Sequence, residues 1–239
     1  MFRNIIFAAV FSLLEICLIF PSGATVIGNG NIVTVNRPVS SPFGGMILEI
    51  KGELSVYQSE TAKIVISIDS NLEQFVQTEI KDGILRIKSK GPEGLRPVKC
   101  TVDVCTRNIN SLTVSGSGKI HIIDKISAES LVLKISGSGE IEGEVECTDL
   151  AAEISGSGKI LLTGKSQMAA FGVSGSGIYE CERLEAGRVH ITASGSVKAL
   201  VNAIEYLQLR ISGSGDIFYR GNPIITTLES GTARIKALE

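Results

Sequence analysis

The chain has 239 residues, of which 44% are apolar, a content that suffices for a folded core and argues against disorder. Its 23 basic and 25 acidic residues are well mixed and leave a net charge of -2, which excludes a strong electrostatic affinity for nucleic acid or for an anionic membrane. Glycine is abundant with 26 residues, tryptophan is absent and aromatic residues make up 5%, a composition typical of short aliphatic strands joined by tight turns.

The N-terminus has the pattern of an export signal, which we assign to residues 1–24. Arg3 supplies a positive charge, residues 5–20 form a largely apolar run, and small residues up to Ala24 predict cleavage after that residue. The alternative is a membrane anchor that is not cleaved. The apolar run is shorter than a membrane-spanning helix, which needs about 20 residues, and Glu15 interrupts it. We therefore expect an exported protein of the periplasm, the outer-membrane surface or the medium, with no membrane span after cleavage.

Residues 25–111 have strand-like patterns without a repeat. Alternating apolar and polar residues predict strands at 47–57, 62–69 and 79–89, and Lys81-Asp82-Gly83 predicts that the last of these folds into a hairpin. Residues 71–76 have the pattern of a short helical turn. Exposed strand edges invite aggregation, so we expect this region to be a β-rich cap for the repeats that follow.

A short motif repeats through the second half of the chain. Ser-Gly-Ser-Gly begins at five positions, a shortened Ser-Gly-Ser begins at Ser194, and a remnant Ser-Gly begins at Ser230. Successive motifs start 18–21 residues apart, a period that is too short for helix-turn-helix repeats. The motif residues predicted to form structural corners are Ser115, Gly116, Ser136, Gly137, Ser155, Gly156, Ser174, Gly175, Ser194, Gly195, Ser212 and Gly213.

The residues before each motif alternate with period 2, as in a half-buried strand. The residue that precedes the first serine is apolar at every corner, and so is the residue two positions earlier, as in Leu133 and Ile135. Lys119, Glu140 and Lys159 alternate in sign, as expected for residues stacked about 4.8 Å apart. We therefore predict an all-β chain whose residues 112–239 form a parallel β-helix, or β-solenoid, with coils of about 19 residues, in a single domain of residues 25–239.

The Ser-Gly-Ser-Gly corners admit a structural and a ligand-binding interpretation. Glycine tolerates positive φ and close backbone approach, and a serine hydroxyl can bond to nearby backbone, which favours structural corners. A row of hydroxyls could instead bind a polar ligand, but phosphate-binding loops are followed by a helix, and here a strand follows. At Ser194 the motif is incomplete, and we expect Val197 to take the position of the isoleucine that follows the other motifs.

Several segments together resemble the putative auto-transporter adhesin, head GIN domain family. They are the serial corners and the stretches Arg37-Pro38-Val39 with Phe43, Ile50-Lys51-Gly52-Glu53-Leu54-Ser55-Val56, Ile80-Lys81-Asp82-Gly83-Ile84-Leu85 and Tyr219-Arg220-Gly221-Asn222-Pro223. The resemblance extends over essentially the whole chain after residue 24. It implies an exported bacterial protein, common in Bacteroidetes, with a right-handed β-helix-like fold, and it brings no catalytic residues.

The residue types needed for catalysis or metal binding are sparse. His121 and His190 lie in different repeats without a nucleophile motif, so we predict no catalytic residue. Cys100, Cys105, Cys147 and Cys181 lack metal-ligand spacing; buried free thiols are favoured, and a long-range disulfide stays open. Glu140, Glu142 and Glu144, with Glu146, alternate along one strand and are weak Ca²⁺ candidates, but a solvated face is the favoured interpretation. We predict no bound metal and no cofactor.

Three functions are consistent with these features. The favoured one is a non-enzymatic surface or periplasmic module for adhesion or scaffolding, which binds a surface glycan or a protein. The second is a polysaccharide lyase or hydrolase, which the absence of tryptophan and of a matched acid pair disfavours. The third is a subunit of an envelope assembly, including a homo-oligomer joined through the ends of the repeat array.

Overall fold

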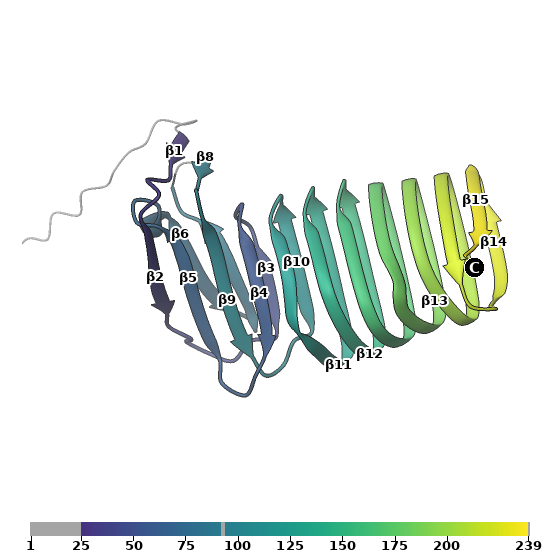
Figure 1. The fold of residues 1–239 in the computed structure, drawn as a ribbon, viewed down its shortest axis with the longest axis horizontal. Coiled ribbons are helices and arrows are strands. Elements are labelled where there is room, and N and C mark those ends of the chain that lie inside the picture. The colour runs from purple at the N-terminus through teal and green to yellow at the C-terminus, as the bar shows by residue number, and fades with distance from the viewer. Residues whose placement is uncertain (1–24, 92–93, 239) are drawn as a thin grey trace, which may run out of the picture.

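The computed structural model describes residues 25–91 and 94–238, which are almost entirely β-strand. The predicted signal segment, residues 1–24, lies outside the described residues. Strands stack side by side along the long axis, with β1 and β8 near one end and β14 and β15 at the other (Figure 1). The N-terminal elements are β1 (Thr25–Ile27), β2 (Ile32–Arg37), β3 (Gly45–Leu48), β4 (Glu53–Gln58), β5 (Lys63–Asp69), the 3-10 helix η1 (Glu73–Phe75), β6 (Val76–Lys81), β7 (Ile84–Ser89), β8 (Gly94–Arg96) and β9 (Cys100–Thr106).

The second half of the chain consists of longer strands that bend at their corners. We call this part the parallel ladder, because all strand pairs within it are parallel. It comprises β10 (Ser111–Gly116), β11 (Lys119–Gly137), β12 (Glu140–Gly156), β13 (Lys159–Arg220), β14 (Ile224–Glu229) and β15 (Thr232–Ala237).

The predicted fold class, a right-handed parallel β-helix, is wrong, because the main sheet has mixed strand orientation. This 13-stranded sheet includes three antiparallel pairs, β2 with β5, β5 with β9 and β6 with β7. At the predicted hairpin, Asp82 and Gly83 have φ angles of 52° and 74° and connect β6 directly to β7. A two-residue turn of this kind reverses the chain, whereas parallel neighbours need a longer connection.

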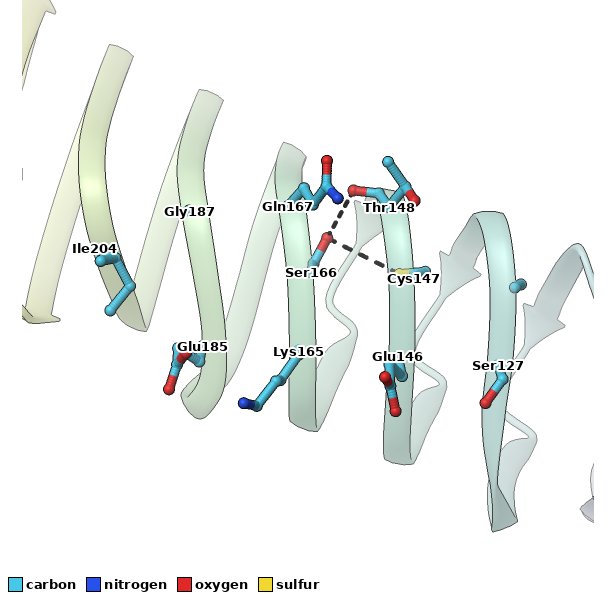
Figure 2. A pocket seen from close by; sticks show the side chains of 11 residues that line it. Ser127, Glu146, Cys147, Thr148, Lys165, Ser166, Gln167, Glu185, Gly187 and Ile204 are labelled. Atoms are coloured by element: carbon cyan, nitrogen blue, oxygen red, sulfur yellow. Dashed lines mark hydrogen bonds between the residues drawn. The ribbon is translucent and has the colours of Figure 1, made fainter.

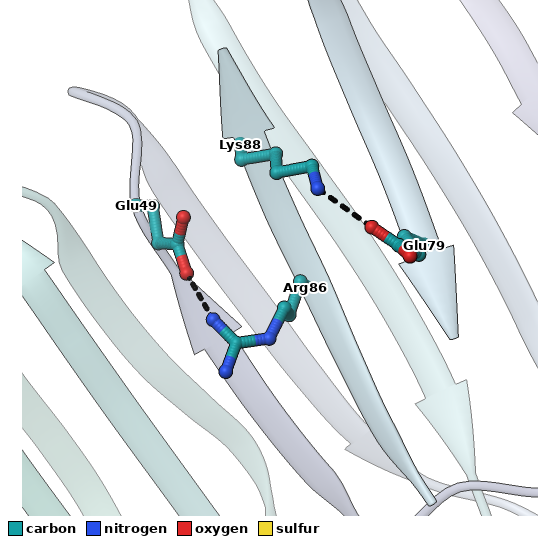
Figure 3. A network of polar contacts seen from close by, with 4 residues as sticks. All are labelled: Glu49, Glu79, Arg86 and Lys88. Carbon is teal, nitrogen blue, oxygen red and sulfur yellow. Dashed lines mark hydrogen bonds and ion pairs between the residues drawn. The ribbon is translucent and has the colours of Figure 1, made fainter. Parts of the chain in front are cut away.

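The N-terminal strands continue the ladder rather than forming a separate layer. β3 pairs in parallel with β10, and β4 pairs in parallel with β11, so both sit in the main sheet. β7 extends the same sheet beyond β3. On the outer face of β7, Arg86 and Lys88 form 2.6 Å ion pairs with Glu49 and Glu79 on the two sides (Figure 3). These pairs join neighbouring strands at their exposed side chains.

The sequence period appears in the structure as the register of the parallel pairs. Ile141 pairs with Ile160 and Ser136 pairs with Ser155, each 19 residues away. The predicted apolar columns are buried, and no member exceeds 5% exposure. These columns are Leu112, Leu133, Ala152, Phe171, Ile191 and Leu209, and Val114, Ile135, Ile154, Val173, Ala193 and Ile211.

The N-terminal end is held together by a buried carboxylate. Asp69 is inaccessible to solvent and accepts hydrogen bonds from the N–H groups of Gly30 at 2.7 Å, Val98 at 2.9 Å and Lys99 at 3.3 Å. Burial opposes ionisation of Asp69, but these N–H donors outweigh it and hold the carboxyl pKa below its ordinary value. One side chain thus connects the loops before β2 and β9.

The corner at Ser194 differs by a substitution and not by a deletion. A Cβ on Gly213 would lie 2.2 Å from the Gly195 carbonyl oxygen, and a Cβ on Gly215 would lie 3.3 Å from Val197. Val197 therefore stands where the other corners have their second glycine, and the expectation that it takes the isoleucine position is wrong. The residue before this motif is Ala193, whereas the other corners have valine or isoleucine there, so a smaller side chain leaves room for Val197.

We expect Ala193→Val to lower the free energy of unfolding by about 1–3 kcal/mol, because it overpacks against Val197. At the neighbouring corner, a Cβ on Gly177 would lie only 2.8 Å from Val173 in the same repeat. Adding Val197→Gly should recover at least about 1 kcal/mol of that loss, since it restores the arrangement of the other corners. Urea titration of the two single variants and the double variant measures this coupling. Additive effects would show that the two side chains do not compensate each other.

Candidate functional site

The predicted corner residues lie in two columns along one edge of the ladder. The pairs Ser115–Ser136, Ser136–Ser155 and Ser155–Ser174 are in register, and so are the glycines that follow them. Close approach of Gly195 to Gly175 and of Gly213 to Gly195 continues the glycine column. The first serine of each motif is exposed. The edge is therefore a regular row of small polar groups.

The predicted acidic cluster is divided among separate partners. Glu140 pairs with Lys119 at 3.2 Å, and Glu142 lies 2.7 Å from His121. β11 is out of register with β12 between Ile122 and Ile126, beside Gly143, whose φ is 148°, and Glu146 lies beyond this irregularity, in the lining of another hollow. Glu144 is exposed. Within the described ranges, no group of three or more His, Cys, Asp or Glu residues has a geometry that could hold a metal ion.

The histidines and cysteines do not meet in a reactive group. The four cysteines in the described part of the chain are free thiols, and Cys100, Cys147 and Cys181 are buried. Burial raises the pKa of the Cys100 thiol to about 11 and that of the Cys181 thiol to about 12. Such thiols stay protonated at neutral pH and are poor nucleophiles.

A groove crosses the ladder at a different corner, which the sequence analysis did not identify. Two surface hollows of about 580 and 540 Å³ adjoin each other, with Ser166, Gln167 and Gly187 in the lining of both, and we call the two together the groove. One wall carries a residue from each of five successive repeats, and their side chains lie in a row (Figure 2). Four spacings of about 4.8 Å give this wall a length of about 19 Å. The wall residues are Ser127, Glu146, Lys165, Glu185 and Ile204.

Small residues that are buried or partly buried form the floor of the groove at a bend of the chain. Ala128, Cys147 and Ser166 are in register, but Thr148 and Gln167 beside them leave the pairing. The Ser166 hydroxyl lies 2.8 Å from the Met168 carbonyl oxygen and bridges this bend. Because the floor side chains are small, the longer side chains on either side stand above it.

The charges of the groove alternate in sign. Lys125 donates to Glu146, and this hydrogen bond, together with the lysine charge, lowers the pKa of the Glu146 carboxyl. In the lining of the second hollow, Arg188 lies 3.7 Å from Glu205, and it lies 5.5 Å from the centre of the Tyr206 ring. Lys165 has no ion pair among the described residues. The groove thus offers positively charged hydrogen-bond donors and negatively charged acceptors to a ligand. The ring of Tyr206 is exposed beside Arg188.

The only sequence signal for this groove was the column of small residues. Ala128, Cys147 and Ser166 recur at a spacing of 19 residues, and the polar residues Glu146 and Lys165 precede two of them. Small residues in a column predict a depression only if the chain bends there. The alternation pattern of the sequence did not indicate that bend.

The groove lining offers hydrogen-bonding side chains of several kinds. Its described lining contains no histidine. A general acid needs a raised carboxyl pKa, and that of Glu146 is lowered. Regularly spaced polar side chains can instead form hydrogen bonds along an extended ligand.

Solved structures with similar folds come from Bacteroides and Parabacteroides species. A putative adhesin from Bacteroides fragilis aligns with a TM-score of 0.81 and 24% identity, over 89% of this chain and 100% of that chain. A putative lipid binding protein from Parabacteroides distasonis has a TM-score of 0.74 and 24% identity, over 90% and 100% of the two chains. A putative adhesin from Parabacteroides merdae has a TM-score of 0.71 and 20% identity, over 90% and 99%. These likenesses establish a shared fold.

No curated protein matches the chain. Within residues 25–91 and 94–238, no helix has the length and hydrophobicity required to cross a bilayer. The profile of one protein family matches residues 42–223, which is more than half of the chain, and confirms the resemblance predicted from the sequence. The chain therefore belongs to the putative auto-transporter adhesin, head GIN domain family.

Proposed function

We propose that this chain is a non-enzymatic adhesin-type module of the cell envelope and that it holds an extended surface glycan in the groove. The observation that carries the proposal is the row of polar side chains from successive repeats along one wall. Strand spacing sets these groups at intervals of about 4.8 Å, which suits a polymer with regularly repeated hydroxyls. Export to the envelope is supported by Arg3 and the apolar run of residues 5–20.

Two features of the groove favour a glycan. Glutamate, lysine and glutamine side chains are strong hydrogen-bonding partners for hydroxyl groups. Tyr206 is 44% exposed beside Arg188 of the groove lining, and the exposed part of its ring is an apolar surface against which a sugar can pack. The mixed signs of Glu146, Lys165 and Glu185 select no strongly charged polymer.

A polysaccharide lyase or hydrolase is the second candidate function. The observation that favours it is the order of Glu146, Lys165 and Glu185 on successive repeats, which places a base between two acids. Against it stands the lowered pKa of Glu146, because glycosidic cleavage needs a protonated acid. Release of reducing ends or of unsaturated products from a bound glycan distinguishes this function from simple binding.

Lipid binding, the activity named for the similar Parabacteroides distasonis protein, has less support here. The more enclosed apolar cavity near the N-terminal end has a volume of about 110 Å³ and is lined in part by Ile68, Leu72 and Leu95. Ligand pockets commonly measure about 300–1,000 Å³, so this cavity is small for an acyl chain.

The groove proposal predicts that Lys165→Glu weakens glycan binding at least tenfold, or about 1.4 kcal/mol. The reason is that the change removes the cationic donor of the wall and leaves three consecutive acidic residues there. Bacterial and host polysaccharides on an array identify the ligand, and titration then gives the dissociation constant. The matched control is Lys198→Glu, the same change at an exposed site of the ladder that does not line the groove.

Equal weakening by both substitutions would indicate general charge repulsion and would contradict the groove as the site. Failure of every polysaccharide to bind would remove the glycan as the ligand. Cleavage products from a bound glycan would establish the enzyme in place of the binding module.

A further inference from the structure

The C-terminal end of the ladder has two strands with a free edge. Among the described strands, β14 and β15 each pair only with β13, and they lie at the end of the molecule in Figure 1. The N–H of Leu238 donates to the Tyr219 carbonyl oxygen at 2.7 Å, so the even-numbered residues of β15 face β13. Successive residues of a strand direct their N–H groups to opposite sides. The N–H groups of Ala233 and Ile235 therefore point to the open edge.

The ion pairs of the ladder share one direction along its axis. In each Lys or Arg ion pair between described residues of the ladder, the base lies in one repeat and the acid lies in the next repeat toward the C-terminus. The acid follows the base by 17–21 residues. These pairs are Lys119–Glu140, Lys125–Glu146, Lys134–Glu153, Lys159–Glu180 and Arg188–Glu205.

β15, the last described strand, carries two basic residues that would need an acid beyond it to continue this series. Arg234 and Lys236 of β15 are exposed, and neither has an ion pair among residues 25–91 and 94–238. Between and beside them, Ile235 and Ala233 are half-buried and pack against the end of the core. On β14, Ile224 is 63% exposed and Leu228 is 57% exposed. The edge thus combines open backbone groups, aliphatic side chains and two positive charges that have no ion pair within the described part of the chain.

We propose that this end binds a partner protein by strand addition along β15. The partner segment is extended, with carboxylates at alternate positions opposite Arg234 and Lys236 and aliphatic side chains between them, over Ile235. Charge complementarity identifies this segment, because in the Lys and Arg ion pairs described for the ladder the acid lies in the next repeat toward the C-terminus. Backbone hydrogen bonds to a free edge supply affinity, and alternate side chains supply specificity.

A second copy of this chain is a poorer occupant. Antiparallel pairing of two β15 edges would place Arg234 of one copy opposite Lys236 or Arg234 of the other. Like charges directly opposite each other on neighbouring strands are destabilising. An acidic strand removes this repulsion and forms two ion pairs.

The test uses synthetic peptides as probes. An acetylated, fluorescent peptide of alternating glutamate and valine should bind the purified protein, and the matched peptide with lysine in place of glutamate should bind at least tenfold more weakly. The double variant Arg234→Glu/Lys236→Glu should reverse this preference. Fluorescence anisotropy measures both affinities. Equal binding of the two peptides to the unmodified protein would overturn the proposal.

A backbone substitution separates strand addition from charge attraction. Ala233→Pro removes an N–H that faces the open edge and leaves Arg234 and Lys236 in place. Proline is tolerated on edge strands at such positions, so the melting temperature should change little. Peptide affinity should fall at least tenfold, and unchanged affinity would contradict strand addition.

Sedimentation of the unmodified protein without peptide tests the competing occupant. A monomer supports the proposal, whereas a dimer that Ala233→Pro dissociates would make a second copy the occupant of this edge. If Ala233→Pro does not fold, the charge-reversal variant still decides between the two peptides. Glycan binding in the groove is measured separately, so failure at either site leaves the other unaffected.

Discussion

Gly156→Ala is expected to prevent stable folding of the ladder, at a cost of more than about 4 kcal/mol in the free energy of unfolding. Gly156 has a φ of 119°, and a Cβ there would lie 2.4 Å from the Gly137 carbonyl oxygen of the previous repeat. The obstructing atom belongs to the backbone of a paired strand, so it cannot move without breaking the ladder. Both the positive φ and the close contact therefore oppose any side chain.

Gly116→Ala is the control that separates these two costs. Gly116 has a φ of 113°, but an added Cβ would have nothing within 4 Å. We expect only the strain of the left-handed region, about 1–2 kcal/mol. Thermal unfolding followed by circular dichroism compares the two variants. Similar melting temperatures would mean that contact between the stacked glycines does not determine stability.

Features set by neighbours in sequence could be predicted, and features set by distant contacts could not. The alternation around Leu133 and Ile135 predicted their burial, and Lys81-Asp82-Gly83 predicted the hairpin of β6 and β7. The antiparallel pairing of β2 with β5 has no such signal. The two strands are separated by β3 and β4, and an alternating pattern is the same for either strand direction.

The sequence pattern also did not predict which repeats carry a large core side chain and which carry a small one at equivalent positions. Tyr179 is fully buried at the position that Ile160 occupies one repeat earlier, and its hydroxyl lies 2.6 Å from the Gly172 carbonyl oxygen. In the next corner, the smaller Ala193 accompanies the larger Val197. A column of apolar residues indicates which face is buried, but not how neighbouring side chains divide the volume.

The groove could not be predicted from the sequence, because the alternation of apolar and polar residues indicates strands but not the bends between them. The four glutamates from Glu140 to Glu146 all alternate with inward-facing residues of β12, but Glu146 lines the groove. Glu142 instead faces His121 in a different hollow. Period-2 alternation indicates which side chains point outward, but it does not indicate which of these outward side chains line the same hollow.

The inward and outward positions of one strand can be tested with adjacent residues. Ile141→Asp is expected to unfold the ladder, with a loss of more than about 4 kcal/mol, because Ile141 is inaccessible between Ile120 and Ile160 and a carboxylate there has no partner.

Its neighbour Glu142 supplies the control. The Glu142 side chain is 42% exposed and contacts His121 at the surface, so Glu142→Ala should change the free energy of unfolding by about 1 kcal/mol or less. Chemical denaturation of both variants gives the two values on one scale. Because a one-residue slip of register exchanges the buried and exposed faces of a strand, comparable losses from the two substitutions would show that the strand is not fixed in the register described for β12.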